Sequence, residues 1–147
     1  MQFRFSLLLL LMSVGCGGTA SENTANDGQD VAPLLAGRVV PEAEIARDLR
    51  AAGFAEDELG QMVCAAKYES SFYAEASHKN HNGSIDYGLF QINDELWAHS
   101  CGLSVTGLYD PAKNAKCARK VYNSGGIRSW YAYRKHQTEC DAYVVRE

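Results

Sequence analysis

The chain has 147 residues, which is enough for one domain and a short N-terminal leader. Its net charge is −4 at pH 7, so it lacks the basic excess that binds nucleic acids or anionic membranes. After the leader, no segment stays apolar for the roughly 20 residues that a membrane-spanning helix needs. We therefore expect no nucleic-acid partner and no membrane-spanning helix in the rest of the chain.

Residues 1–16 have the order of a secretory signal peptide. Arg4 precedes an apolar run with five consecutive leucines at positions 7–11, and small residues follow. We expect cleavage before Cys16 and lipid attachment to that cysteine, although Ser13 stands where lipoprotein signals usually have leucine. The alternative is ordinary cleavage near Gly18 without a lipid. Both alternatives predict an exported protein. If it contacts a membrane, we expect it to do so only through a lipid on Cys16.

The segment after the signal peptide is rich in Gly, Ser, Thr, Asn and Asp up to residue 30. It has too few apolar side chains to offset the entropy that is lost when a chain becomes ordered. We therefore expect a disordered tether over residues 17–36 and a folded domain over residues 37–147.

Four cysteines remain once Cys16 is set aside, namely Cys64, Cys101, Cys117 and Cys140. An even number in an exported chain predicts two disulfides, and four cysteines allow three pairings, between which the residues alone do not choose. The cysteine spacings match no zinc-binding pattern, and the histidines are scattered along the chain. We expect no metal site and no cofactor.

Three helices are predicted from capping residues and apolar spacing. Pro41 starts the first, which Gly53 ends. The second covers residues 56–71, with acidic residues at its start and apolar residues at helical spacing. The third begins at Asp110 and Pro111 and ends near residue 125, where two glycines follow one another.

A hairpin is predicted between the second and third helices. Asn82 and Gly83 form the strongest short turn signal in the chain, and residues 85–87 read as a strand that leaves this turn. The fold class is therefore α+β, mainly helical with a small antiparallel hairpin sheet.

Two acids stand out as a pair. Glu69 lies in the last turn of the second helix among apolar neighbours, where burial raises the pKa of a carboxyl group and lets it hold a proton. Asp86 lies on the hairpin strand near side chains that can donate hydrogen bonds to a carboxylate, namely Asn80, Asn82, Ser84 and Asn93. Glycoside hydrolysis needs one protonated and one ionised acid across a sugar. Taken singly, Glu69 also fits a solvated helix end and Asp86 a turn cap.

At these residues the sequence resembles a known family. Residues 63–72, VCAAKYESSF, resemble the catalytic-glutamate helix of c-type lysozymes, and residues 82–93, NGSIDYGLFQIN, resemble their catalytic-aspartate hairpin. Residues 114–118 resemble the next helix of that family, and Trp130 with its following residues resembles the segment after it. The resemblance implies a lysozyme-like fold with a cleft between its two parts. It also implies a peptidoglycan hydrolase that cleaves the β-1,4 bond between N-acetylmuramic acid and N-acetylglucosamine.

The resemblance also implies roles for individual residues. Glu69 would be the acid and base, Asp86 the nucleophile or charge stabiliser, and Trp130 the apolar wall that raises the pKa of Glu69. The residues expected to orient Asp86 or to contact sugar are Asn80, Gln91, Asn93, Trp97, Trp130 and Tyr133. The disulfides implied are Cys64–Cys140 and Cys101–Cys117. One departure is Leu96, which stands where the family usually has a second stacking aromatic residue beside Trp97.

Two other functions share parts of this pattern. A lytic transglycosylase would cut the same bond with Glu69 alone and leave an anhydro sugar. A non-catalytic module like α-lactalbumin would need clustered aspartates for calcium, and the stretch between Cys101 and Cys117 offers only Asp110. We expect the hydrolase, acting as a monomer on the glycan strands of peptidoglycan.

Overall fold

The structure is a computed structural model that describes residues 37–146. The predicted signal peptide, Cys16 and the predicted tether lie outside the described residues. The helices and strands, in chain order, are α1 (Glu42–Ala51), α2 (Glu56–Ser70), β1 (Ser77–Lys79), β2 (Ile85–Tyr87), β3 (Ile92–Asn93), the π-helical turn η1 (Asp94–Ala98), α3 (His99–Cys101), α4 (Val105–Leu108), α5 (Pro111–Gly125), the 3₁₀ turn η2 (Ile127–Ser129), α6 (Tyr131–Lys135) and α7 (Gln137–Asp141). The predicted α+β class, mainly helical with a small antiparallel sheet, is confirmed.

The three predicted helices begin where their capping residues stand. The Asp110 carboxylate accepts a hydrogen bond from the backbone N–H of Lys113 at 2.9 Å, and Pro111 is the first residue of α5. At the start of α2 the Glu58 carboxylate accepts from the N–H of Ala55 at 2.8 Å. Both contacts satisfy backbone groups that a helix leaves without partners at its ends.

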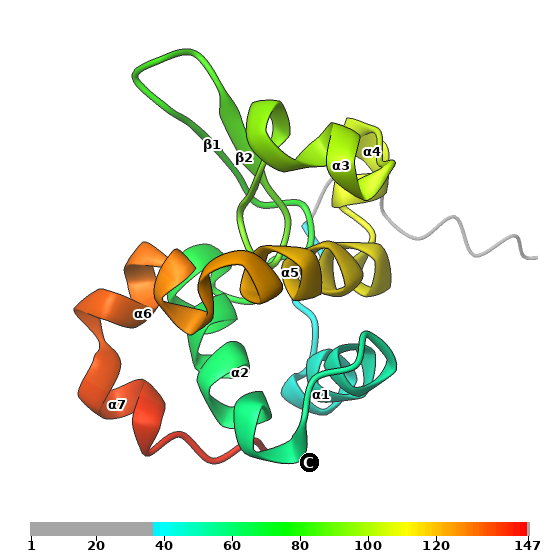
Figure 1. Cartoon of the computed structure of the whole chain (residues 1–147). Helices are drawn as coiled ribbons and strands as arrows, with labels where there is room; N and C mark the ends of the chain where they lie inside the picture. The colour runs from blue at the N-terminus through cyan, green and yellow to red at the C-terminus, as the bar shows by residue number, and fades with distance from the viewer. Residues whose placement is uncertain (1–36, 147) are drawn as a thin grey trace, which may run out of the picture. The chain divides into compact units, whose positions relative to one another are not determined.

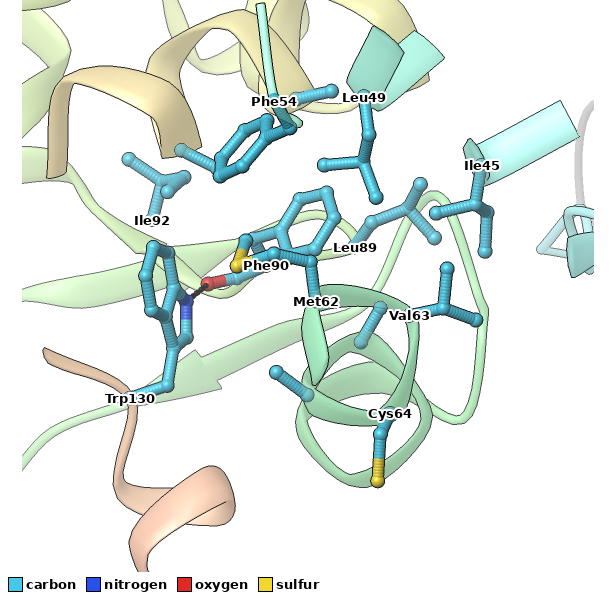
Figure 2. Packing of buried hydrophobic residues seen from close by; sticks show 14 of the residues in the cluster. Ile45, Leu49, Phe54, Met62, Val63, Cys64, Leu89, Phe90, Ile92 and Trp130 are labelled. Carbon is cyan, nitrogen blue, oxygen red and sulfur yellow. Dashed lines mark hydrogen bonds between the residues drawn. The ribbon is translucent and has the colours of Figure 1, made fainter. Parts of the chain in front are cut away.

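The hydrophobic core lies where α1, α2 and α5 meet. Figure 1 shows α1 and α2 on one side of α5, with β1 and β2 on the other. Figure 2 shows Ile45 and Leu49 of α1 and Met62 and Val63 of α2, all fully buried, around Leu89 and Phe90. Burying one such side chain contributes about 1.5–3 kcal/mol, so this cluster fixes the position of α2 and of the loop that follows β2.

The sheet has the order β1-β2-β3 with antiparallel neighbours. Asp86 is in the central strand, opposite His78 on one side and Asn93 on the other. The chain reverses where the turn was predicted, but through a five-residue connection rather than a two-residue turn. The N–H of Asn80 donates to the carbonyl of Ser84 at 2.8 Å, and Gly83 has a φ of 98°.

Asn114, fully buried on α5, ties this helix to the sheet. Its carbonyl oxygen accepts from the N–H of Phe90 at 2.9 Å, and its amide donates to the carbonyl oxygens of Tyr87 at 3.0 Å and Leu108 at 2.6 Å. Gly88 passes so close that a β-carbon there would overlap the Asn114 amide. A single polar side chain therefore sets how the sheet sits on α5.

Both disulfides have the pairing that the family resemblance implies. Cys64 of α2 is bonded to Cys140 of α7, and Cys101 of α3 is bonded to Cys117 of α5. The first joins the helix that carries Glu69 to the last helix of the chain. None of the helices between residues 37 and 146 combines the length and the apolar character needed to cross a membrane.

Candidate active site

Glu69 lies in the last turn of α2, just before the chain turns sharply. Ser71 and Phe72 both have positive φ, 52° and 66°, which is uncommon for residues with a side chain. The segment before α1 holds this turn in place, since the N–H of Val40 donates to the carbonyl of Phe72 at 2.9 Å. The strained turn ends α2 and leaves the Glu69 side chain half-buried at a cleft.

The surroundings of Glu69 favour its protonated form. Burial raises the pKa of the Glu69 carboxyl above its ordinary value. The backbone N–H of Ala132, 3.1 Å from Oε1, opposes that rise, the negative charge of Asp86 reinforces it, and Arg134 opposes it. Burial dominates, so the pKa of this carboxyl is raised overall.

Trp130 supplies part of the apolar surface of the cleft that Glu69 lines. Its side chain is 5% exposed, and its Nε1–H donates to the carbonyl of Phe90 at 2.9 Å, the dashed contact in Figure 2. The Trp130 and Phe90 rings meet edge to face with their centroids 6.3 Å apart. The hydrogen bond satisfies the one polar group of the indole, so that the ring can remain in the apolar floor of the cleft.

Asp86 has a more polar environment. Asn93 donates from Nδ2 to Asp86 Oδ1 at 2.7 Å and also to the Ser84 hydroxyl at 2.9 Å. Asn80 donates to the same hydroxyl at 3.2 Å, and that hydroxyl donates to Asn82 at 2.8 Å. Of the four polar side chains expected around Asp86, only Asn93 contacts the carboxylate directly. The other three form a network that holds Asn93 and the loop in place.

Glu69 and Asp86 line the same cleft, which has a volume of about 580 Å³. The helical side contributes Glu69 and Trp130, the sheet contributes Asp86, and η1 contributes Trp97. The other expected contact residues that line the cleft are Asn80, Gln91 and Asn93. Gln91 has a φ of 46°, and its amide donates to the carbonyl of Gly88 at 2.9 Å, so its side chain is fixed at the cleft wall.

Tyr133 does not lie with these residues. Its side chain is 4% exposed, its hydroxyl donates to Asp141 at 2.7 Å, and it is not part of the cleft lining. The expectation that Tyr133 contacts sugar is therefore corrected. Each residue of a helix turns by about 100°, so Tyr131 and Tyr133, two positions apart, point in nearly opposite directions. Tyr131 is the residue of α6 that lines the cleft.

Sequence reasoning also missed the Ala132 N–H that contacts Glu69. It is a backbone group, and the residue type at position 132 says nothing about what its N–H binds. The one available signal was its place at the start of a helix, where N–H groups have no helical partner, but α6 is too short to predict. Within residues 37–146 no three His, Cys, Asp or Glu side chains are arranged to hold a metal ion.

Comparison with known proteins places the chain in one family. The C-type lysozyme/alpha-lactalbumin family matches residues 38–144. Lysozyme C from Ortalis vetula is 39% identical over 90 residues, which cover 53% of this chain and 70% of that protein. A lysozyme from Bombyx mori is 37% identical over 101 residues, covering 63% and 74%. Lysozyme C from Dromaius novaehollandiae is 35% identical over 120 residues, covering 71% and 82%. With a match that spans nearly the whole described domain, this chain belongs to the C-type lysozyme/alpha-lactalbumin family.

Proposed function

We propose that this protein is a muramidase, which hydrolyses the β-1,4 bond between N-acetylmuramic acid and N-acetylglucosamine in peptidoglycan. One observation carries the proposal: a carboxyl whose pKa is raised by burial and a carboxylate held by an amide donor line the same cleft. Glycoside hydrolysis uses such a pair. Lysozyme itself is the standard example of two active-site carboxyl groups whose different environments give them different pKa values.

In the proposed reaction, Glu69 gives its proton to the glycosidic oxygen as the bond to the leaving sugar breaks. Asp86, kept in place by Asn93, either stabilises the positive charge at the anomeric carbon or bonds to it. Glu69 then removes a proton from a water molecule, which attacks the same carbon from the side that the leaving sugar has vacated. The proposed outcome is hydrolysis with retained anomeric configuration.

The cleft walls suggest how sugar is held. Trp97 is half-buried on η1 and offers an aromatic surface, whereas Leu96 beside it is 73% exposed and offers only an aliphatic one. Asn80 and Gln91 supply amide groups that can hydrogen-bond to sugar hydroxyls and acetamides, whereas the amide N–H groups of Asn93 are taken by Asp86 and Ser84. Specificity would come from these few polar groups, and most of the contact area from the apolar ones.

We further propose that the protein is exported by the signal peptide of residues 1–16, with lipid attached to Cys16 and residues 17–36 as a tether. The two disulfides support export, since such bonds persist in oxidising compartments. Mass spectrometry of the protein from its native membranes tests the anchor. A diacylglycerol adduct on Cys16 is expected, and a soluble protein that begins after Cys16 would contradict it.

Digestion of purified peptidoglycan tests the function. The wild-type protein is expected to release fragments with ordinary reducing ends, as identified by mass spectrometry. Glu69→Gln should lose nearly all activity and Asp86→Asn most of it, because each variant removes one member of the pair. Glu95→Gln is the matched control, since Glu95 is exposed and lies outside the cleft.

Two results would count against the proposal. Wild-type activity in Glu69→Gln would remove the general acid from the mechanism. Products with 1,6-anhydro ends would instead assign the protein as a lytic transglycosylase, which does not use water to complete the reaction.

A further inference from the structure

One exposed aromatic ring lies at the cleft and has no role in the mechanism above. Tyr131, the first residue of α6, is 66% exposed. Of the large hydrophobic side chains that the structure describes as exposed, only Tyr131 and Leu96 line the cleft. A ring that stays out of the core and faces a ligand-binding cleft offers its apolar surface to whatever enters.

The backbone of Tyr131 is fixed relative to the catalytic acid. The residue before it, Trp130, is anchored by its indole hydrogen bond to Phe90. The residue after it, Ala132, donates its N–H to Glu69. Because both neighbours are held, the backbone at Tyr131 stays at the rim of the cleft as long as the contact between Ala132 and Glu69 is kept.

The ring of Tyr131 is also supported from one side. The Arg134 guanidinium lies over it, 5.6 Å from the ring centroid, and Arg134 in turn donates to the carbonyl of Arg128. Arg134 does not line the cleft, so the guanidinium leaves ring surface free on the cleft side. Within residues 37–146 the Tyr131 hydroxyl has no hydrogen-bond partner, and it too is free to bind a ligand.

We infer that Tyr131 is a sugar-stacking residue on the Glu69 side of the cleft, packing against the apolar face of an N-acetylated sugar ring of the bound glycan. The inference rests on the proposed function, because that function makes the cleft a glycan site. Axial C–H groups give one face of a pyranose an apolar character that suits an aromatic ring. Trp97 would provide the corresponding surface on the other wall, where Leu96 offers none that is aromatic.

Binding measurements in an inactive background test this role. The full-length Glu69→Gln protein is titrated with the hexamer of β-1,4-linked N-acetylglucosamine by isothermal calorimetry, so that the ligand is not consumed. Tyr131→Ala in this background is expected to raise the Kd roughly tenfold. Tyr131→Trp, which keeps an aromatic face, should bind like the parent. Tyr73→Ala is the matched control, since Tyr73 is 44% exposed and lies outside the cleft.

Two further readouts separate the possible failures. Tyr131→Gln keeps a side chain of similar length, and its circular dichroism and thermal melting are compared with those of the parent, so that loss of fold is not mistaken for loss of stacking. If the parent binds the hexamer and the folded Tyr131→Ala and Tyr131→Gln proteins bind equally well, the inference is overturned while the proposed function stands. If the Glu69→Gln parent does not bind the hexamer at all, the inference is overturned, and the digestion of peptidoglycan decides the proposed function separately.

Discussion

At the scale of single residues, the two cleft acids differ in what surrounds them. Glu69 is half-buried, lines the cleft together with buried Trp130 and receives one backbone hydrogen bond, whereas Asp86 lies on a strand and receives an amide hydrogen bond at 2.7 Å. The same chemical group is thus placed in an apolar and in a polar setting on opposite sides of one cleft. This difference of environment allows two carboxyl groups to take different roles.

The raised pKa of Glu69 predicts a pH-dependent change in stability. A carboxyl whose pKa is raised in the folded state stabilises the fold below its unfolded pKa, and this contribution is lost as the pH rises through the folded pKa. Glu69→Gln cannot ionise, so it should be more stable than wild type at pH 7, and the difference should shrink toward pH 3. Urea unfolding of both proteins across this range measures it. A Glu69→Gln protein that loses stability at pH 7 would contradict the direction of the shift.

Asn93 is predicted to act as a positioning residue for Asp86. Its amide donates to the Asp86 carboxylate, and its carbonyl oxygen accepts from the N–H of Leu96 at 3.1 Å at the start of η1. Asn93→Asp keeps the cap but replaces the donor with a second carboxylate, which should lower kcat about 10- to 100-fold while KM changes little. The exposed Asn123→Asp is the control for the change of charge. Wild-type kcat in Asn93→Asp would remove this role.

At the scale of elements, the sequence predicts long helices well and short ones poorly. α2 and α5 have capping residues and several turns of apolar spacing, so their bounds could be predicted within a residue or two. α3, α4, α6 and α7 have five residues or fewer, too few for a periodic pattern, and their positions depend on contacts with the rest of the fold. The expectation that Tyr133 lies at the cleft came from the family resemblance, and no local pattern could show that Tyr131 lies there instead. Both belong to α6, whose orientation no local pattern fixes.

Asn114 is predicted to be the polar residue on which the docking of α5 to the sheet depends most. Asn114→Ala would leave one buried N–H and two carbonyl oxygens without this partner and would create a cavity. The free energy of unfolding should fall by about 3 kcal/mol or more, as measured by urea denaturation. Asn123→Ala, on the exposed face of the same helix, should change it by less than about 0.5 kcal/mol. A similar effect for both variants would show that the buried contacts do not matter.

At the scale of the whole molecule, the two disulfides close loops of very different length. Cys64 and Cys140 are 76 residues apart in sequence, whereas Cys101 and Cys117 are 16 apart. Cross-linking restricts the unfolded chain more when the loop is longer. Replacing both cysteines of the first pair with alanine should therefore cost about 1 kcal/mol more than replacing the second pair. Chemical denaturation of the two double variants tests this order, and the reverse order would show that local packing around the bonds outweighs loop length.

The mechanism requires that Glu69 keep its proton where an ordinary glutamate has lost it. A carbon-13 NMR titration of carboxyl-labelled glutamates measures this directly, with Glu69 assigned by the signal that Glu69→Gln lacks. The pKa of Glu69 should lie above the ordinary value of 4.5, and it should fall in Asp86→Asn, because that variant removes a nearby negative charge. A Glu69 carboxyl that titrates at or below 4.5 would contradict its role as the general acid.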